Sequence, residues 1–159
     1  MAKTRVAVNG FGRIGRNAFK IAFARSDVEI VAVNDLTDTK TLAYLLKHDS
    51  NYGAYDKEVG HDDKNLIVEG QHIVVLAEKD PAMLPWKDMQ IDVVIESTGR
   101  FTDKEGASKH ITAGAKRVVI SGPTKSDGVD TIVCLNAVPI PERILSNLNG
   151  ASTFPLNDI

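Results

Sequence analysis

Cysteine is nearly absent from this sequence, because Cys134 is the single one among 159 residues. One cysteine excludes an internal disulfide and fits a reducing compartment. Long apolar runs are also missing, so no segment is long enough to span a bilayer, and the N-terminus carries no signal-peptide core. We therefore expect a cytoplasmic protein without a membrane partner.

Neither sign of charge is in excess. The chain has 19 Lys and Arg against 21 Asp and Glu, a net charge of −2. This balance does not favour nucleic acid or an anionic membrane as a partner. The four histidines show no metal-ligand spacing, so no metal site is expected. The length suits one domain with a sizeable core and is too short for a cofactor domain plus a full substrate domain.

The most informative motif is a glycine-rich turn. Gly10, Gly12 and Gly15 follow the apolar residues 6–9 and open a helix-like stretch that begins at Arg13. The first glycine permits a sharp turn, the second leaves the backbone open to a pyrophosphate, and the third lets the helix pack close to the strand. Phosphates would meet the free N–H groups at the start of that helix. The pattern predicts a dinucleotide site.

An acidic residue stands at the distance that such a site requires. Asp35 follows the apolar residues 30–33 and lies twenty residues after Gly15. Its carboxylate can accept hydrogen bonds from the adenosine ribose and would repel a 2′-phosphate. Leu36 offers no compensating donor, so we expect NAD to be preferred over NADP. The alternative interpretation is that Asp35 is a helix N-cap.

Strand-like and helix-like patterns alternate along the chain. We predict strands over residues 6–9, 30–34, 91–96 and 117–121, another beginning at 131, helices beginning at 13 and 38, a helix over 103–113, and a hairpin of 66–68 with 72–77. In the first helix the inward stripe is predicted to be Ile14, Ala18, Ile21 and Ala22, and in the second Leu42, Leu45 and Leu46. Residues 51–60 are expected to form a loop.

This alternation predicts an α/β fold of the Rossmann type, a doubly wound, mostly parallel sheet with an inserted β-hairpin. We assign residues 1–135 to one NAD-binding domain. Residues 136–159 are expected to be a divergent, poorly ordered tail, with one short helix starting at Pro141.

Several segments together resemble the NAD-binding domain of phosphorylating glyceraldehyde-3-phosphate dehydrogenase. They are Val-Asn-Gly-Phe-Gly-Arg-Ile-Gly-Arg at 8–16, Val-Asn-Asp-Leu at 33–36, Leu-Leu-Lys-His-Asp-Ser at 45–50, Pro-Trp at 85–86, Glu-Ser-Thr-Gly-Arg-Phe at 96–101, Gly-Ala-Lys-Arg-Val-Val-Ile-Ser at 114–121 and Thr-Ile-Val at 131–133. The resemblance covers about residues 3–133. After it, Cys134-Leu135-Asn136 departs from the family, in which a nucleophilic cysteine motif follows. We therefore expect no catalytic residue here and no substrate domain, with Cys134 a buried, inert thiol.

The glycine motif, the strand ends and the resemblance together predict the cofactor-binding residues. These are Asn9, Gly10, Phe11, Gly12, Arg13, Ile14, Gly15, Asp35, Leu36, Lys79, Ser97, Thr98, Gly99, Phe101 and Ser121. The resemblance implies backbone contacts from Arg13 and Ile14, and a nicotinamide-side hydroxyl at Ser121. Lys79 stands where the family often has an arginine near adenine, and a solvated surface lysine is the alternative.

The resemblance implies an oxidoreductase that passes hydride from an aldehyde to NAD during glycolysis. This chain would be its cofactor-binding part, catalytically incomplete by itself. A non-catalytic NAD-binding or interaction module, and a fragment of erythrose-4-phosphate dehydrogenase type, are the alternatives. Because the family is homotetrameric and strands apolar on both faces need cover, we expect self-association and marginal stability of the isolated chain.

Overall fold

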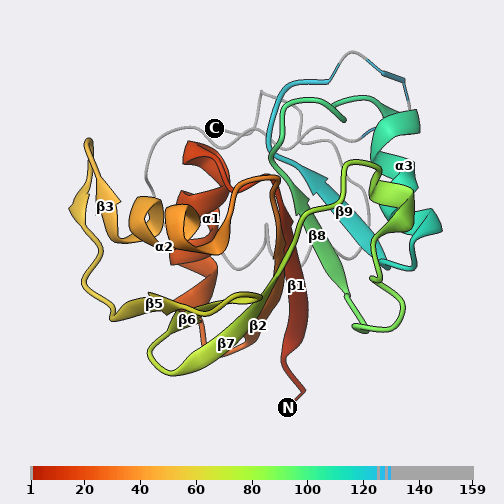
Figure 1. The fold of residues 1–159 in the computed structure, drawn as a ribbon. Helices are drawn as coiled ribbons and strands as arrows, with labels where there is room; N and C mark the ends of the chain where they lie inside the picture. Colours follow the sequence, from red (N-terminus) through yellow and green to blue (C-terminus); the bar gives the residue numbers. More distant parts are fainter. Residues whose placement is uncertain (1, 125, 128, 130–159) are drawn as a thin grey trace, which may run out of the picture.

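The computed structural model describes residues 2–124, 126–127 and 129 (Figure 1). They include a seven-stranded sheet in the order β5-β6-β7-β2-β1-β8-β9. Its strands are β1 (Thr4–Asn9), β2 (Val28–Asn34), β5 (Val59–His61), β6 (Asn65–Val68), β7 (Gln71–Leu76), β8 (Val93–Glu96) and β9 (Arg117–Ile120). The strands from β7 to β9 in this order pair in parallel, whereas β5, β6 and β7 pair antiparallel. The predicted Rossmann-type sheet with an inserted hairpin is confirmed.

The hairpin has a two-residue turn. Glu69 and Gly70 join β6 to β7, and both have positive φ, 50° and 77°. Two consecutive residues with positive φ match the right-handed twist of paired strands, and glycine adopts that backbone without strain. The strand after the turn begins at Gln71, one residue earlier than predicted.

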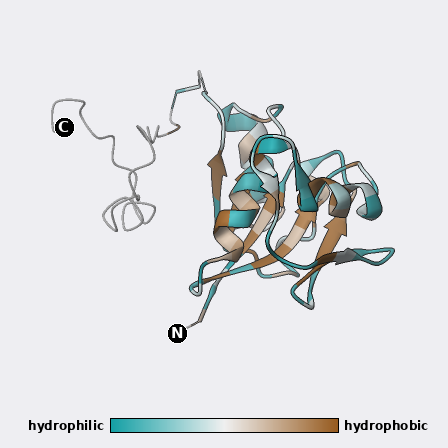
Figure 2. Ribbon diagram, turned by 90° about the vertical axis from the view of Figure 1, so that its left-hand side faces the viewer, coloured by the Kyte–Doolittle hydropathy of each residue, from teal (hydrophilic) through white to brown (hydrophobic). Residues whose placement is uncertain are grey.

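The two faces of the sheet carry separate cores. Val6 and Val8 of β1 belong to one apolar cluster, while Ala7 between them belongs to the other, as the alternation of side chains along a strand requires. The pairing of β1 with β2 shifts register between Val6 and Ala7. In Figure 2 the hydrophobic residues concentrate on the strands of the sheet.

Helix α1 (Arg13–Phe23) packs through a stripe that matches the predicted one only in part, since Ala22 packs against the apolar cluster. Ile14 and Ile21 are 57% and 69% exposed, so their assignment to the inward face was wrong. The helix instead buries Gly15 and Phe19, and Phe19 stacks on Phe23 with ring centroids 5.6 Å apart. Residues 15, 19 and 23 lie on one face of a helix, and this face carries the close glycine contact and the large rings.

The other helices begin with aspartate caps. In α2 (Thr39–Lys47) the Asp38 carboxylate accepts from the backbone N–H of Thr41, and Leu42 and Leu46 are buried as predicted, with Leu45 only partly so. In α3 (Lys104–Thr112) Asp103 plays the same capping role. A 3-10 turn, η1 (Pro81–Met83), contacts α3.

Residues 51–60 were expected to be loop, and this is only partly correct. Within this range β4 (Gly53–Ala54) pairs antiparallel with β3 (His48–Asp49), which precedes it, and β5 begins at Val59. The strand predicted from residue 131, the helix at Pro141, Cys134 and the tail lie outside the described residues. Within the described part, no helix is long and apolar enough to cross a membrane.

The corrected stripe of α1 predicts unequal effects for two substitutions on the same helix. Phe19→Ala should lower the free energy of unfolding by about 3–5 kcal/mol, because the ring is fully buried. Ile21→Ala should change it by no more than about 0.5 kcal/mol, because that side chain is exposed. Urea denaturation of both variants measures the difference, and equal losses would contradict the observed packing of α1.

Candidate dinucleotide-binding site

A cleft of about 290 Å³ opens at the carboxyl ends of the parallel strands. Asn9 ends β1, Asn34 ends β2, and Ser97 and Thr98 follow β8. Strand β1 lies between β2 and β8. The strand order therefore runs from β1 toward β2 in one direction and from β1 toward β8 in the other, and it reverses at this point. Ligands of open α/β sheets bind at this kind of switch point.

The three glycines of the motif have three different surroundings. Gly10 has φ +88°, and a Cβ placed on it would lie 2.6 Å from the backbone nitrogen of Thr98. A Cβ on Gly15 would lie 2.0 Å from the carbonyl oxygen of Gly10. A Cβ on Gly12 would meet no atom of the described chain within 4 Å. The first and third glycines are therefore required by packing, and the second faces open space in the cleft.

Helix α1 presents an uncapped N-terminus to this space. Its N-cap is Gly12, which makes no side-chain hydrogen bond to the helix, and the first turn holds no acidic side chain. Within the described residues, the N–H groups of this turn therefore have no side-chain acceptor. Free N–H groups and the positive end of the helix dipole form an anion site suited to a pyrophosphate.

Asp35 is held next to the glycine loop by two backbone donors. Its Oδ2 accepts from the N–H of Phe11 at 2.8 Å, and its Oδ1 accepts from the N–H of Thr37 at 3.0 Å. The N-cap of α2 is Asp38, so the alternative that Asp35 caps this helix is wrong. Its carboxylate lines the cleft beside Leu36.

Ser97 and Thr98 hold the loops of the site as well as lining it. The Ser97 hydroxyl donates to the carbonyl oxygens of Gly10, at 2.7 Å, and Asn9, at 3.1 Å. The Thr98 hydroxyl donates to Glu96 and accepts from the backbone N–H of Arg100. Ser97 therefore ties the loop after β8 to the glycine loop after β1.

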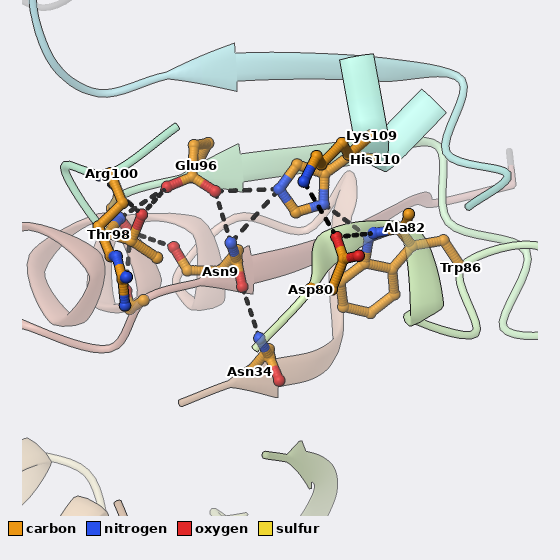
Figure 3. Close-up of polar contacts among 12 residues, drawn as sticks. Asn9, Asn34, Asp80, Ala82, Trp86, Glu96, Thr98, Arg100, Lys109 and His110 are labelled. Carbon is orange, nitrogen blue, oxygen red and sulfur yellow. Dashed lines mark hydrogen bonds and ion pairs between the residues drawn. The ribbon is translucent and has the colours of Figure 1, made fainter. Parts of the chain in front are cut away.

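A buried polar cluster adjoins the cleft through Asn9 and Thr98, which line it (Figure 3). Glu96 and His110 are 1% and 0% exposed, and the carboxylate bonds His110, Asn9 and Thr98. Burial raises the pKa of the Glu96 carboxyl, but the hydrogen bonds from His110, Thr98 and Asn9 outweigh it, so this pKa lies below its ordinary value. The carboxylate is therefore ionised at neutral pH although it is buried.

The structure brings most of the predicted site residues to one cleft. Those that line it are Asn9, Gly10, Gly12, Asp35, Leu36, Lys79, Ser97, Thr98 and Phe101. Lys79 is exposed at its rim, which fits both interpretations of that residue.

Other predicted residues do not line this cleft. Phe11 buries its ring against Phe19, and only its backbone reaches the site. Ile14 is exposed, Arg13 lines a second hollow beside α2, and Gly15 is buried beneath the loop. Gly99 and Ser121 are also absent from the lining residues.

Three lining residues were missed in the sequence, namely Asn34, Glu78 and Arg100. Asn34 could have been found, because it ends β2 as Asn9 ends β1. Glu78 and Arg100 stand in loops that carry no comparable pattern. Among the described residues, no group of three or more His, Cys, Asp or Glu side chains could hold a metal ion.

The glycine loop, the uncapped helix and the fixed carboxylate define a dinucleotide-binding domain of the α/β class. The sequence model of the family "Glyceraldehyde 3-phosphate dehydrogenase, NAD binding domain" matches residues 4–104. The chain therefore belongs to the glyceraldehyde-3-phosphate dehydrogenase family and contains its NAD-binding domain.

Curated relatives agree with this assignment. Glyceraldehyde-3-phosphate dehydrogenase of Geobacillus stearothermophilus is 52% identical over 146 residues, covering 90% of this chain and 44% of the relative. That of Thermotoga maritima is 51% identical over 152 residues, covering 94% and 46%. That of Candida glabrata is 57% identical over 121 residues, covering 76% and 36%. The chain thus spans less than half the length of these relatives.

The similarity reaches further along the chain than the motifs do. An alignment that covers 94% of 159 residues must extend past Val133, the last residue of the quoted motifs. The Mycoplasma pneumoniae protein, 54% identical, aligns with 81% of the chain. Some relatives therefore align with part of the segment that we expected to be divergent.

The surroundings of the glycines predict opposite outcomes for two alanine substitutions. Gly15→Ala should destabilise the fold by about 2 kcal/mol or more, because the methyl group would collide with the Gly10 carbonyl. Gly12→Ala should cost only about 1 kcal/mol through the helix cap. It should nevertheless weaken ADP-ribose binding, because its methyl group would occupy the open space. Urea denaturation and calorimetry measure the two effects, and equal stability of the two variants would contradict this assignment.

Proposed function

We propose that this chain binds NAD in the cleft at the carboxyl ends of β1, β2 and β8. The pyrophosphate lies on the N-terminal turn of α1 over Gly12, and the adenosine ribose hydroxyls donate to Asp35. The observation that carries the proposal is the bond from the Phe11 N–H to the Asp35 carboxylate, 2.8 Å long. It fixes the ribose acceptor directly beside the phosphate-binding loop.

The charge of Asp35 supports selection of NAD against NADP. Two unit charges about 4 Å apart repel by about 4 kcal/mol at an effective dielectric near 20. A 2′-phosphate on the ribose would meet that repulsion, and the neighbouring Leu36 is an exposed apolar side chain that offers no donor. The cleft therefore favours the cofactor that carries a free 2′-hydroxyl.

We further propose that the chain is the cofactor-binding part of an enzyme that oxidises a phosphorylated aldehyde, with NAD accepting the hydride. The support is family membership together with the coverage, since the chain matches less than half of each relative. Glyceraldehyde 3-phosphate is the proposed substrate of the whole enzyme. Erythrose 4-phosphate is the alternative substrate.

Self-association of the chain belongs to the same proposal. Several large apolar side chains of the described part are exposed, among them Ile14, Tyr44 and Tyr52. We propose that exposed apolar side chains of this kind are covered by a second copy of the chain. Sedimentation of the purified chain tests this, and a monomer at all concentrations would contradict it. A cytoplasmic location is proposed on the single cysteine alone.

The nucleotide preference should depend on Asp35. Asp35→Ala should reduce the ratio of NAD to NADP affinity by about tenfold, because the repulsion of the 2′-phosphate is lost. Calorimetric titration with both nucleotides measures the ratio. No NAD binding by the folded wild-type chain at millimolar concentration would refute the proposed function.

A matched control lies three residues further on. Asp38→Ala removes the N-cap of α2 and should lower the free energy of unfolding by about 1 kcal/mol. It should leave the nucleotide ratio unchanged, because the Asp38 side chain does not line the cleft. Two outcomes would contradict a direct contact between Asp35 and the ribose. One is an unchanged ratio of NAD to NADP affinity in Asp35→Ala, and the other is a changed ratio in Asp38→Ala.

Turnover should be absent from the 159-residue chain by itself. A covalent acyl-enzyme needs a thiolate with a nearby base, and Cys134 stands outside the family's nucleophile motif. Absorbance at the NADH band, with glyceraldehyde 3-phosphate, phosphate and NAD present, is the measurement. If the chain does turn over and Cys134→Ser abolishes that turnover, this cysteine is a nucleophile and the prediction is wrong. NAD binding without turnover is expected both of an incomplete enzyme and of a non-catalytic module.

A further inference from the structure

A chain of hydrogen bonds runs beneath the cleft from Trp86 to Glu96. The indole Nε1–H of Trp86 donates to Nδ1 of His110 at 2.9 Å. Nε2 of His110 lies 2.9 Å from Oε2 of Glu96. Since an indole nitrogen only donates, Nδ1 accepts, and the proton of the neutral imidazole is on Nε2. His110 therefore donates to Glu96, so each hydrogen bond in the series is donated in the same direction, from Trp86 to His110 and from His110 to Glu96.

The bonding groups around the Glu96 carboxylate are all donors. Oε2 accepts from His110 and from the side-chain amide of Asn9. Oε1 accepts from the backbone N–H of Thr98 at 2.8 Å and from the Thr98 hydroxyl. A carboxylate, which only accepts, satisfies all four donors. An amide at this position would turn a donor toward one of them and leave buried groups unpaired.

The same carboxylate bonds two residues that line the cleft, Thr98 and Asn9. On one side it holds Thr98, which lines the cleft after β8. On the other it holds Asn9, whose Oδ1 accepts from the amide of Asn34 at 2.7 Å. Asn34 exchanges hydrogen bonds with the backbone N–H and carbonyl of Glu78, both at 2.8 Å. The loops after β1, β2, β7 and β8 are thus joined through one buried group.

We propose that Glu96 is the positioning residue of the cofactor cleft, aligned by Trp86 and His110 and fixing Thr98 after β8 and Asn9 with Asn34 at the ends of β1 and β2. The inference rests on the proposed NAD site and deepens it. Neither Glu96 nor His110 lines the cleft, so both act through the residues that do. Figure 3 shows the order of these contacts, from the indole to the two asparagines.

Glu96→Gln tests the proposal, because it keeps the shape of the side chain and replaces one acceptor oxygen by an NH2 group, which donates. In the folded variant the dissociation constant for ADP-ribose should rise by about tenfold or more, because either Thr98 or Asn9 then faces the amide NH2, a donor, where the carboxylate offered an acceptor. Calorimetry well below the melting temperature of the variant measures binding separately from stability. A dissociation constant within about twofold of the wild type would overturn the proposal and leave Glu96 a purely structural residue.

Leu66→Ala is the control for loss of stability alone. Leu66 is fully buried in β6, outside the lining of the cleft, so its truncation should lower the melting temperature. It should change the ADP-ribose dissociation constant by less than about twofold. Weakening of binding by Leu66→Ala equal to that by Glu96→Gln would overturn the proposal, because binding would then follow stability.

The wild-type chain provides a second readout that needs no variant. Trp86 is the only tryptophan, so its indole N–H gives one resonance in a proton–nitrogen correlation spectrum. Saturation with ADP-ribose should shift this resonance, because the chain of bonds joins the indole to the cleft. If Glu96→Gln does not fold, this measurement decides, and an unmoved resonance at saturation overturns the proposal. Absence of any binding by the wild type would instead refute the proposed NAD site itself.

Discussion

The pairing of Asn9 with Glu96 is the interaction on which the cleft depends. It joins the ends of two neighbouring parallel strands, β1 and β8, through side chains that are 87 positions apart in the sequence. Both side chains are almost completely buried, so each polar atom needs a partner within the protein. Asn9 meets this need with Glu96 on one side and Asn34 on the other. The ends of β1, β2 and β8 are therefore held in the relative arrangement that lets the side chains of Asn9, Asn34 and Glu96 make these hydrogen bonds.

Local spacing was sufficient to predict the phosphate-binding part of the site. The glycines at 10, 12 and 15 and the carboxylate at 35 are each set by a short segment of chain, and the structure places three of them, Gly10, Gly12 and Asp35, around one cleft. The hairpin was predictable for the same reason, since Gly70 takes the positive φ that its turn requires. Alternation of strands and helices then fixed the parallel sheet.

Features that depend on which groups meet in three dimensions were not predictable in this way. The aliphatic period of α1 selected Ile14 and Ile21, whereas the helix is oriented by the approach of Gly15 to the Gly10 carbonyl and by the ring of Phe19. Hydrophobicity alone does not show which apolar side chain has a partner. The partnership of Glu96 with His110 likewise exists only after β8 and α3 have met.

The glycine loop is confined on two sides. The backbone of Gly15 in α1 lies so close to the Gly10 carbonyl that no Cβ would fit between them, and the Ser97 hydroxyl donates to that same carbonyl from the end of β8. The loop is therefore ordered by the fold itself and does not need a ligand to give it shape. Association with a nucleotide then incurs little entropic cost for ordering the protein, and more of the contact free energy remains as affinity. Preorganisation of this kind favours rapid capture of a freely diffusing cofactor, because no slow rearrangement has to precede binding.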